Sequence, residues 1–441
     1  MGILLQLVFL LLLGTASFYI FRNVKRIRRN ILLGKPENRA DQPMLRLKTM
    51  ALVALGQKKM FKKPIPAVLH LAVYLGFLIV NIEILEIVID GLAGTHRIFA
   101  PYLGTIYPLL INVFEFFAVS VIVACVVFLV RRHFLSIPRL QSAELTAAPK
   151  LDANIILITE IVLMLALLSM NATDLVLQAR GSHHYFYTGN FFFSGLLIPF
   201  FNLFSNETLV VIERLCWWFH IAGVLAFANY VFYDSKHLHI FMAFINTYFS
   251  KLTPAGKFEN MPTVTKEVKL MLSLPLTEAE TALGDAGRFG AKDATDLTWK
   301  NLLDAYSCTE CGRCTQQCPA NITGKKLSPR KIMMDTRDRI EEIGKNIDAK
   351  GKDYDDGKSL LDTYITAEEL LACTTCNACV EACPINIDPL SIIVQLRQYR
   401  IMEASQAPAA WNGMLSSIEN NAAPWKFSPS DRMNWVDKLN K

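Results

Sequence analysis

The 441-residue sequence has little charge: only 19% of its residues are Asp, Glu, Lys or Arg, whereas 52% are hydrophobic. Soluble globular domains usually carry about 25% charged residues. The deficit belongs to one half of the chain, because long apolar runs dominate up to Tyr248. From Lys251 onward, no apolar run approaches the roughly 20 residues that cross a bilayer. The composition therefore excludes an ordinary soluble protein and indicates a membrane half followed by a polar half.

Signatures of self-contained enzymes are also absent. The sequence contains no glycine-rich nucleotide-binding fingerprint and no Cys-Cys-Gly (CCG) triplet. Its net charge of +6 needs no nucleic-acid partner, because a dense share of the basic residues lies between the first two apolar runs, beside anionic headgroups. Cys125 and Cys216 lie within apolar runs, where we expect them to be packing residues.

Five apolar stretches are long enough to span a bilayer: 3–21, 65–89, 106–130, 155–177 and 209–233. Basic clusters follow the first stretch, precede the second and end the third at Arg131 and Arg132. The positive-inside rule therefore predicts an inner-membrane protein with its N-terminus outside and everything after the fifth span in the cytoplasm. The apolar segment 191–204 is too short to span, and we expect it at the outer leaflet.

The polar half contains two cysteine quartets with the spacing C-x-x-C-x-x-C-x-x-x-C-P. They are Cys308, Cys311, Cys314 and Cys318, and Cys373, Cys376, Cys379 and Cys383. In this motif three thiolates bind one [4Fe-4S] cluster and the fourth binds the other cluster. We therefore expect Cys383 to complete the first cluster and Cys318 the second. Zinc is the alternative, but zinc sites usually use paired C-x-x-C knuckles, and a reducing cytoplasm disfavours disulfides.

The predicted fold is all-α, with a five-helix transmembrane bundle followed by a helical dicluster ferredoxin domain. The long segment between Cys318 and Cys373 exceeds what a minimal ferredoxin needs, which favours an enlarged helical variant. We assign residues 1–250 to the membrane domain, 251–300 to a linker, 301–404 to the dicluster domain and 405–441 to a tail.

Three histidines lie at similar depth near the cytoplasmic side of the membrane. His70 is a short way into the second span, and His237 and His239 follow the fifth. Two neutral imidazoles at one level on facing helices can bind the iron of a haem b. We predict His70 and His239 as these ligands, with His237 as the runner-up. The alternative places His237 and His239 among lipid headgroups.

Other ionisable residues lie deeper in the membrane, where they are costly and need partners. His220 is near the middle of the fifth span, and it could be a hydrogen-bonded core residue, a quinone contact or a ligand of a second haem. Glu115, in the third span, is a candidate proton relay. Glu83, Glu86 and Asp90 share one face near the outer end of the second span, which favours an interfacial position.

Together these motifs resemble two known groups of proteins over nearly the whole chain. The His70 span and the stretch 217–239 resemble the haem b subunits of respiratory nitrate reductase (its γ subunit) and of membrane-bound heterodisulfide reductase. The motifs CTECGRC at 308–314, LSP at 327–329 and CTTC at 373–376 resemble heterodisulfide-reductase-like Fe-S oxidoreductases. Val80 stands where the nitrate reductase pattern has a second histidine. The CCG modules of the Fe-S oxidoreductases are missing.

The resemblance implies an electron-transfer subunit. It would link membrane quinone, through haem b and two [4Fe-4S] clusters, to a separate cytoplasmic CCG-domain subunit. The stretch 424–435 resembles the segment that leads into a CCG module, so we expect a second polypeptide to supply the substrate chemistry. We assign no catalytic residue to this chain. The alternative is a membrane-anchored redox sensor or scaffold, in which the clusters signal instead of conducting.

Overall fold

The computed structural model describes residues 2–254, 256–258, 260–284 and 288–439. Helices and short helical turns form all the regular structure in these residues, apart from two isolated backbone bridges. The predicted all-α class is therefore confirmed.

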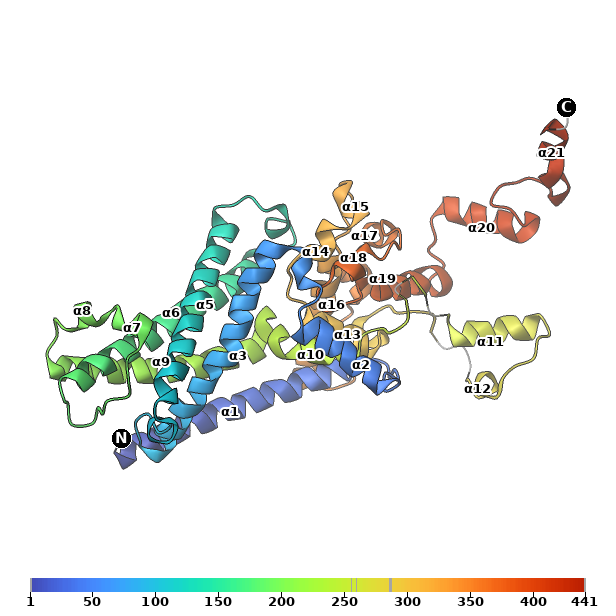
Figure 1. The fold of residues 1–441 in the computed structure, drawn as a ribbon. Coiled ribbons are helices and arrows are strands. Elements are labelled where there is room, and N and C mark those ends of the chain that lie inside the picture. The colour runs from blue at the N-terminus through green and yellow to red at the C-terminus, as the bar shows by residue number, and fades with distance from the viewer. Residues whose placement is uncertain (1, 255, 259, 285–287, 440–441) are drawn as a thin grey trace.

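Five helices are long and apolar enough to cross a membrane, and they lie where the apolar stretches predict them. They are α1 (Ile3–Ile31), α3 (Pro64–Ala93), α5 (Ile106–His133), α6 (Ala147–Ala179) and α9 (Asn206–Asp234). Helix α6 packs against α5 and α9, α3 packs against α5, and α1 packs against α9 and α3 (Figure 1). Large apolar side chains such as Leu109 and Phe116 remain exposed on the outside of this bundle, as lipid-facing residues must.

One end of the bundle, which we call the distal end, carries short helices that do not span. They are α4 (Ala100–Leu103), α7 (Phe192–Gly195) and α8 (Ile198–Phe201). Helix α7 packs against α5 and α6, and both α7 and α8 lie at the left of Figure 1, far from the cysteine-rich region.

The opposite end, the cluster end, faces the cysteine-rich region. Its short elements are α2 (Pro43–Met50), η1 (Ala51–Leu55), η2 (Met60–Lys62), η3 (Pro138–Leu140), η4 (Lys236–Leu238) and α10 (His239–Tyr248). The segment that follows contains α11 (Pro262–Met271), α12 (Glu278–Thr281) and η5 (Ala294–Asp296).

The cysteine-rich region consists of short helices around the longer α16. They are α13 (Trp299–Ser307), α14 (Arg313–Gln316), α15 (Pro319–Ile322), α16 (Pro329–Lys350), η6 (Leu360–Tyr364), α17 (Ala367–Leu371), α18 (Ala378–Ala382), α19 (Pro389–Gln398) and η7 (Tyr399–Glu403). Local sequence fixes where several of them begin: Thr298 and Thr366 form capping boxes, and a proline opens α16 and α19. The helices bury a common apolar core that includes Leu302, Ile332 and Ile393.

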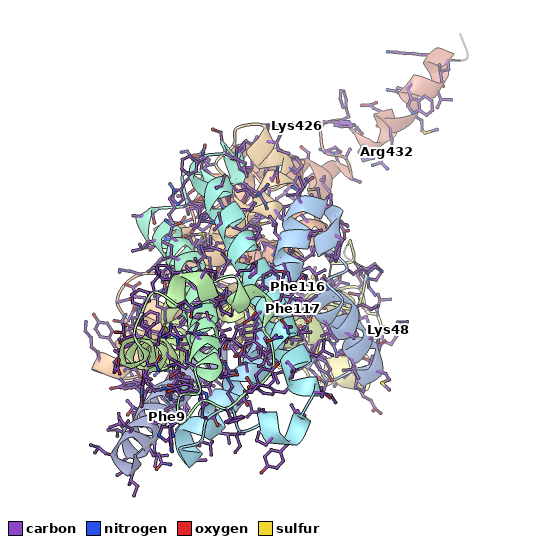
Figure 2. All side chains as sticks on the ribbon, turned by 60° about the vertical axis from the view of Figure 1, so that its left-hand side comes forward. Phe9, Lys48, Phe116, Phe117, Lys426 and Arg432 are labelled. Atoms are coloured by element: carbon purple, nitrogen blue, oxygen red, sulfur yellow. The ribbon has the colours of Figure 1, made fainter. Side chains whose placement is uncertain are left out.

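The tail contains α20 (Ala409–Asn421), η8 (Pro429–Met433) and α21 (Asn434–Leu439). Most of its side chains are exposed. Figure 2 shows Lys426 and Arg432 on this segment, which projects away from the body of the protein.

Helix α1 joins the membrane bundle to the cysteine-rich region. Its Asn30 amide donates a buried hydrogen bond to the Tyr306 hydroxyl at 2.9 Å, and Arg29 pairs with Asp348 on α16. A Cβ at Gly344 would clash with the Asn30 amide, so a larger residue there would displace this amide from its hydrogen bond. The two halves are thus packed directly on one another.

Candidate redox site

The four thiols predicted for the first cluster line one small cavity. They belong to Cys308, Cys311, Cys314 and Cys383. The first three lie between α13 and α14, where Glu310 and Gly312 adopt left-handed backbone conformations with φ of +54° and +71°. These two turns bring the three closely spaced thiols to the same cavity, and Cys383 reaches it from the end of α18.

Cys318, the last cysteine of the first quartet, lies near the second quartet. Burial is the main cause that raises the pKa of Cys373 and Cys379, and the neighbouring Cys318 raises the pKa of both further. Burial and the nearby Cys311 likewise raise the pKa of Cys383 to about 12. The structure therefore brings together the cysteines that crossed ligation requires.

The geometry suits a cluster better than a single ion. Within the described ranges, no three Cys, His, Asp or Glu side chains converge closely enough to hold one metal ion. The thiols of the first cavity line a common space, and the all-sulfur donor set is the one that a [4Fe-4S] cubane requires. Because buried thiols are neutral, cluster insertion must release their protons.

A cavity of about 350 Å³ separates the first cysteine loop from the cluster end of the bundle. Thr309, Cys311 and Arg313 line one wall. The three predicted histidines, His70, His237 and His239, line another. The structure thus gathers residues from the second span, the turn after the fifth span and the cysteine loop around one space.

The rings of His70 and His239 are spaced as ligands of one iron. Their centroids lie 6.2 Å apart. With metal–imidazole bonds of about 2 Å, an iron between two opposed rings would place the centroids about 6 Å apart. The Lys236 carbonyl lies 3.1 Å from Nδ1 of His239 and accepts a hydrogen bond from it, which leaves Nε2 for a metal.

His237 remains the runner-up. Its ring centroid lies 5.5 Å from that of His239 and 5.7 Å from that of Phe227. Burial, helped by the neighbouring His239 and His70, lowers the pKa of His237 to about 3, and burial also lowers the pKa of His239. Both imidazoles are therefore neutral at physiological pH, the state that binds iron.

Basic side chains surround the cluster end of this cavity: Arg131, Arg132, Arg139, Lys236 and Arg313. Two of them also hold the cysteine loop, because Arg139 donates to the Cys311 carbonyl at 3.1 Å and Lys236 pairs with Glu310 at 2.8 Å. This positive rim complements the carboxylates of a haem, so the donor set and its charge both fit that group.

His220 lies apart from the other histidines and is not among the residues lining this cavity. It is fully buried, and its Nδ1 lies 2.9 Å from the Leu163 carbonyl. Its Nε2 has no hydrogen-bond partner among the described residues. Val80 is buried in an adjoining apolar cluster with Ile221. The Nδ1 contact agrees with a hydrogen-bonded core histidine, whereas the unpaired Nε2 is equally available to a ligand, so the three possibilities left open by the sequence stay predictions.

Glu83, Glu86 and Asp90, for which the sequence favours an interfacial position, are all buried inside the protein. The partners of Glu86 and Asp90 come from the loop after α3 and from the start of α5, which the sequence pattern could not place. The Arg97 amide donates to Asp90 at 2.7 Å, and the Tyr107 hydroxyl donates to Glu86 at 2.8 Å. Neither carboxylate oxygen of Glu83 has a partner in the described part of the chain.

Glu115, the candidate proton relay, is fully engaged in hydrogen bonds. It accepts the backbone N–H groups of Phe193 and Ser194, both at 3.0 Å, and the Asn171 amide at 3.2 Å. Arg97 donates to the same Asn171 at 2.7 Å and pairs with Asp174. These contacts hold α7 and the loop after α3 at the distal end.

Sequence reasoning missed Tyr74 and Glu160, which also line the large cavity, and it treated Cys125 there as packing alone. A signal existed for Glu160. It is an ionisable residue inside the fourth apolar stretch, and such residues are functional candidates by default.

Residues 307–387 match the 4Fe-4S dicluster domain family. The polar half therefore carries two [4Fe-4S] clusters on dicluster cysteines, as the spacing predicts. Assignment of each cysteine to a cluster stays a prediction.

The chain is also similar to larger oxidoreductases. Over 98% of its length it is 27% identical to the "Probable iron-sulfur-binding oxidoreductase FadF" of Bacillus subtilis and 25% identical to the "EtfAB:quinone oxidoreductase" of Syntrophomonas wolfei. It covers 61% and 59% of these relatives. Over 24% of its length it is 34% identical to one polypeptide of the ferredoxin/F420H2-dependent CoB–CoM heterodisulfide reductase of Methanosarcina acetivorans, and it covers 52% of that polypeptide. No solved structure matches.

The chain is thus a membrane-anchored iron–sulfur electron-transfer protein related to these oxidoreductases. The predicted resemblance to heterodisulfide reductases is confirmed for the dicluster half.

Proposed function

We propose that this chain conducts electrons between membrane quinone and a separate soluble CCG-domain iron–sulfur subunit, through a haem b and two [4Fe-4S] clusters. The observation that best supports a haem is the 6.2 Å separation between the ring centroids of His70 and His239. These rings line a cavity whose opposite wall is the first cysteine loop. When bound, haem and clusters take up and release single electrons.

The order of the haem and the two clusters follows from the residues that their cavities have in common. Cys311 lines both the histidine cavity and the first cysteine cavity, so the first cluster is the neighbour of the haem. Cys376 of the second quartet is exposed, so the second cluster faces a partner. We assign Cys308, Cys311, Cys314 and Cys383 to the first cluster, and Cys373, Cys376, Cys379 and Cys318 to the second.

The protein itself contributes ligands, charge and insulation. Lys59 donates to the Val380 carbonyl at 3.3 Å and to the Asn386 amide oxygen at 3.0 Å, which ties the segment before α3 to the end of α18. Together with Arg139 and Lys236, it holds the cysteine loops against the histidine cavity.

The relatives support both ends of this chain of centres. One is named for quinone and another is a subunit of a heterodisulfide reductase, which motivates the quinone and the separate partner. The basic residues beside the cluster end, including Lys62, Lys63 and Arg132, support a cytoplasmic dicluster domain and an outside N-terminus.

The decisive experiment is the dithionite-reduced optical spectrum of purified variants. His70→Ala should abolish the reduced haem absorption, whereas His96→Ala should retain it, because His96 contacts Asp174 at the distal end. His237→Ala should also retain it if His239 is the second ligand. A haem-free wild-type protein from cells supplied with haem would refute the haem proposal. Quinol-dependent reduction of the clusters in membranes would separate conduction from sensing.

A further inference from the structure

The cavity that contains His70 continues past the histidines into the membrane part of the bundle. Its lining there consists of Tyr74 and Phe77 from α3, Cys125 and Phe128 from α5, and Glu160 from α6. Along α6 the lining runs from Ala153 to Glu160, which corresponds to about 10 Å of helix. We call this part the inner chamber. It is beyond the imidazoles as seen from the clusters.

Two polar groups of the inner chamber have no protein partner. The Tyr74 hydroxyl is buried and makes no hydrogen bond within the described residues. Glu160 likewise makes no hydrogen bond or ion pair within the described residues. Its carboxyl lies close to the Cys125 thiol, which lines the same cavity. The buried Tyr74 hydroxyl costs free energy without a partner, and the half-buried Glu160 carboxyl lines the same cavity, so a ligand that pairs with both is expected.

The remaining walls define the ligand. Phe77, Phe128 and Leu157 are apolar or aromatic, which suits a flat ring. Leu78 of α3 also lines the cavity and is 43% exposed, from which we infer an entrance from the bilayer between the helices. A fitting molecule is lipid-soluble, has a planar ring and carries polar atoms that accept hydrogen bonds and protons.

We propose that the inner chamber is the quinone-binding site and that Glu160 exchanges protons with the bound quinone. This inference rests on the proposed function and adds the place where the quinone reacts. The Tyr74 hydroxyl donates a hydrogen bond to one quinone oxygen and orients the ring. The position beside His70 keeps the quinone next to the last electron carrier of the chain.

The chemistry balances in either direction. For reduction, the clusters supply two electrons in succession, and the quinone takes up two protons to become quinol. Glu160 donates the first proton, regains one from water at the basic rim of the cavity and donates the second. For oxidation, the carboxylate accepts the first proton, releases it to water at the basic rim, then accepts and releases the second in the same way, and the two electrons would leave toward the clusters.

The distal end offers a matched control. Glu83 is a buried glutamate without hydrogen-bond partners among the described residues, and it lies near Glu86, outside the inner chamber. Glu83→Gln and Glu160→Gln therefore make the same chemical change outside and inside the chamber, and neither breaks a described hydrogen bond.

The test uses the full chain with its haem and clusters in lipid vesicles, and a short-chain quinol as electron donor. Glu160→Gln should retain the reduced haem spectrum and both cluster EPR signals but slow cluster reduction by quinol at least tenfold. Tyr74→Phe should chiefly raise the KM for quinol, and Glu83→Gln should match the wild type. A photoreactive azidoquinone should label peptides containing Tyr74 or Glu160.

Several results would overturn the proposal. They are a wild-type rate for Glu160→Gln, a slowed rate for Glu83→Gln alone, azidoquinone labelling confined to the distal end, and loss of haem in Glu160→Gln, which would make this residue part of the haem site. Two other results would instead refute the proposed function on which the inference rests: a wild-type chain that lacks haem, or one whose clusters no quinol can reduce.

Discussion

Glu310 is the residue whose replacement tests most directly how the two halves are held together. It lies between Cys308 and Cys311, and its carboxylate is 2.8 Å from Lys236 Nζ and 2.7 Å from Arg337 Nη2. Burial raises the pKa of Glu310, but the two cations outweigh this effect and the net pKa lies below its usual value. The carboxylate is therefore ionised at neutral pH and links the cysteine loop to the turn that carries His237.

The substitution Glu310→Gln removes the charge and keeps the size. Each charge-assisted hydrogen bond contributes about 1.5–3 kcal/mol, and a neutral amide would keep about 1 kcal/mol of the total. We expect a net loss of about 2–5 kcal/mol, in the range found when one partner of a buried ion pair is removed. The cysteine loop should then detach more readily from the histidine cavity.

The assay is thermal unfolding of the detergent-solubilised chain, combined with stopped-flow electron transfer between haem and clusters. Glu381→Gln is the matched control, because Glu381 pairs with Lys62 while 66% and 57% of their side chains are exposed. Such exposed pairs contribute less than about 1 kcal/mol. Equal effects of Glu310→Gln and Glu381→Gln on stability would refute the reasoning.

Three further predictions concern the clusters, the partner and pH. Cys318→Ser should remove the second cluster and Cys383→Ser the first, as judged by EPR and iron content; loss of the cluster belonging to each residue's own quartet would exclude crossed ligation. Truncation after Gln406 should weaken co-purification of a cysteine-rich subunit and leave both clusters intact, since the removed helices lie outside the dicluster core. Hydrogen bonds from Arg339 lower the pKa of Asp356 to about 2, so the stability from this pair should be present above about pH 4 and disappear toward pH 2 in denaturation curves. Arg339→Met should abolish that dependence.

Sequence reasoning succeeded where a fixed spacing or a long run determines the structure. The spacing of the two quartets predicts [4Fe-4S] clusters, because three thiols in seven residues have few other uses. The apolar runs predict the positions of all five long helices. The estimated depth of His70 and His239 in the membrane also predicted that they lie at one level, because both are near helix ends on the same side of the bundle.

The rest depends on contacts between distant segments. Asn30 and Tyr306 meet across 276 positions of sequence, and no local pattern predicts that contact. Glu86 looked interfacial because its partners, Phe99 and Tyr107, belong to the next loop and helix. The charge of Glu160 inside an apolar stretch marked it as a candidate, but its cavity is formed by several helices at once, and periodicity describes only one helix.

The length of α1 has a mechanical consequence. Its 29 residues span about 44 Å, whereas the hydrocarbon core is about 30 Å thick, so about nine residues extend beyond the lipid. Among them, Ile27 and Ile31 are part of the apolar core that includes Leu302. A single inserted residue would rotate this pair by about 100° and turn it out of that core, and a seven-residue insertion would restore the phase but displace it by about 10 Å. The helix therefore sets both the height and the rotation of the clusters relative to the membrane.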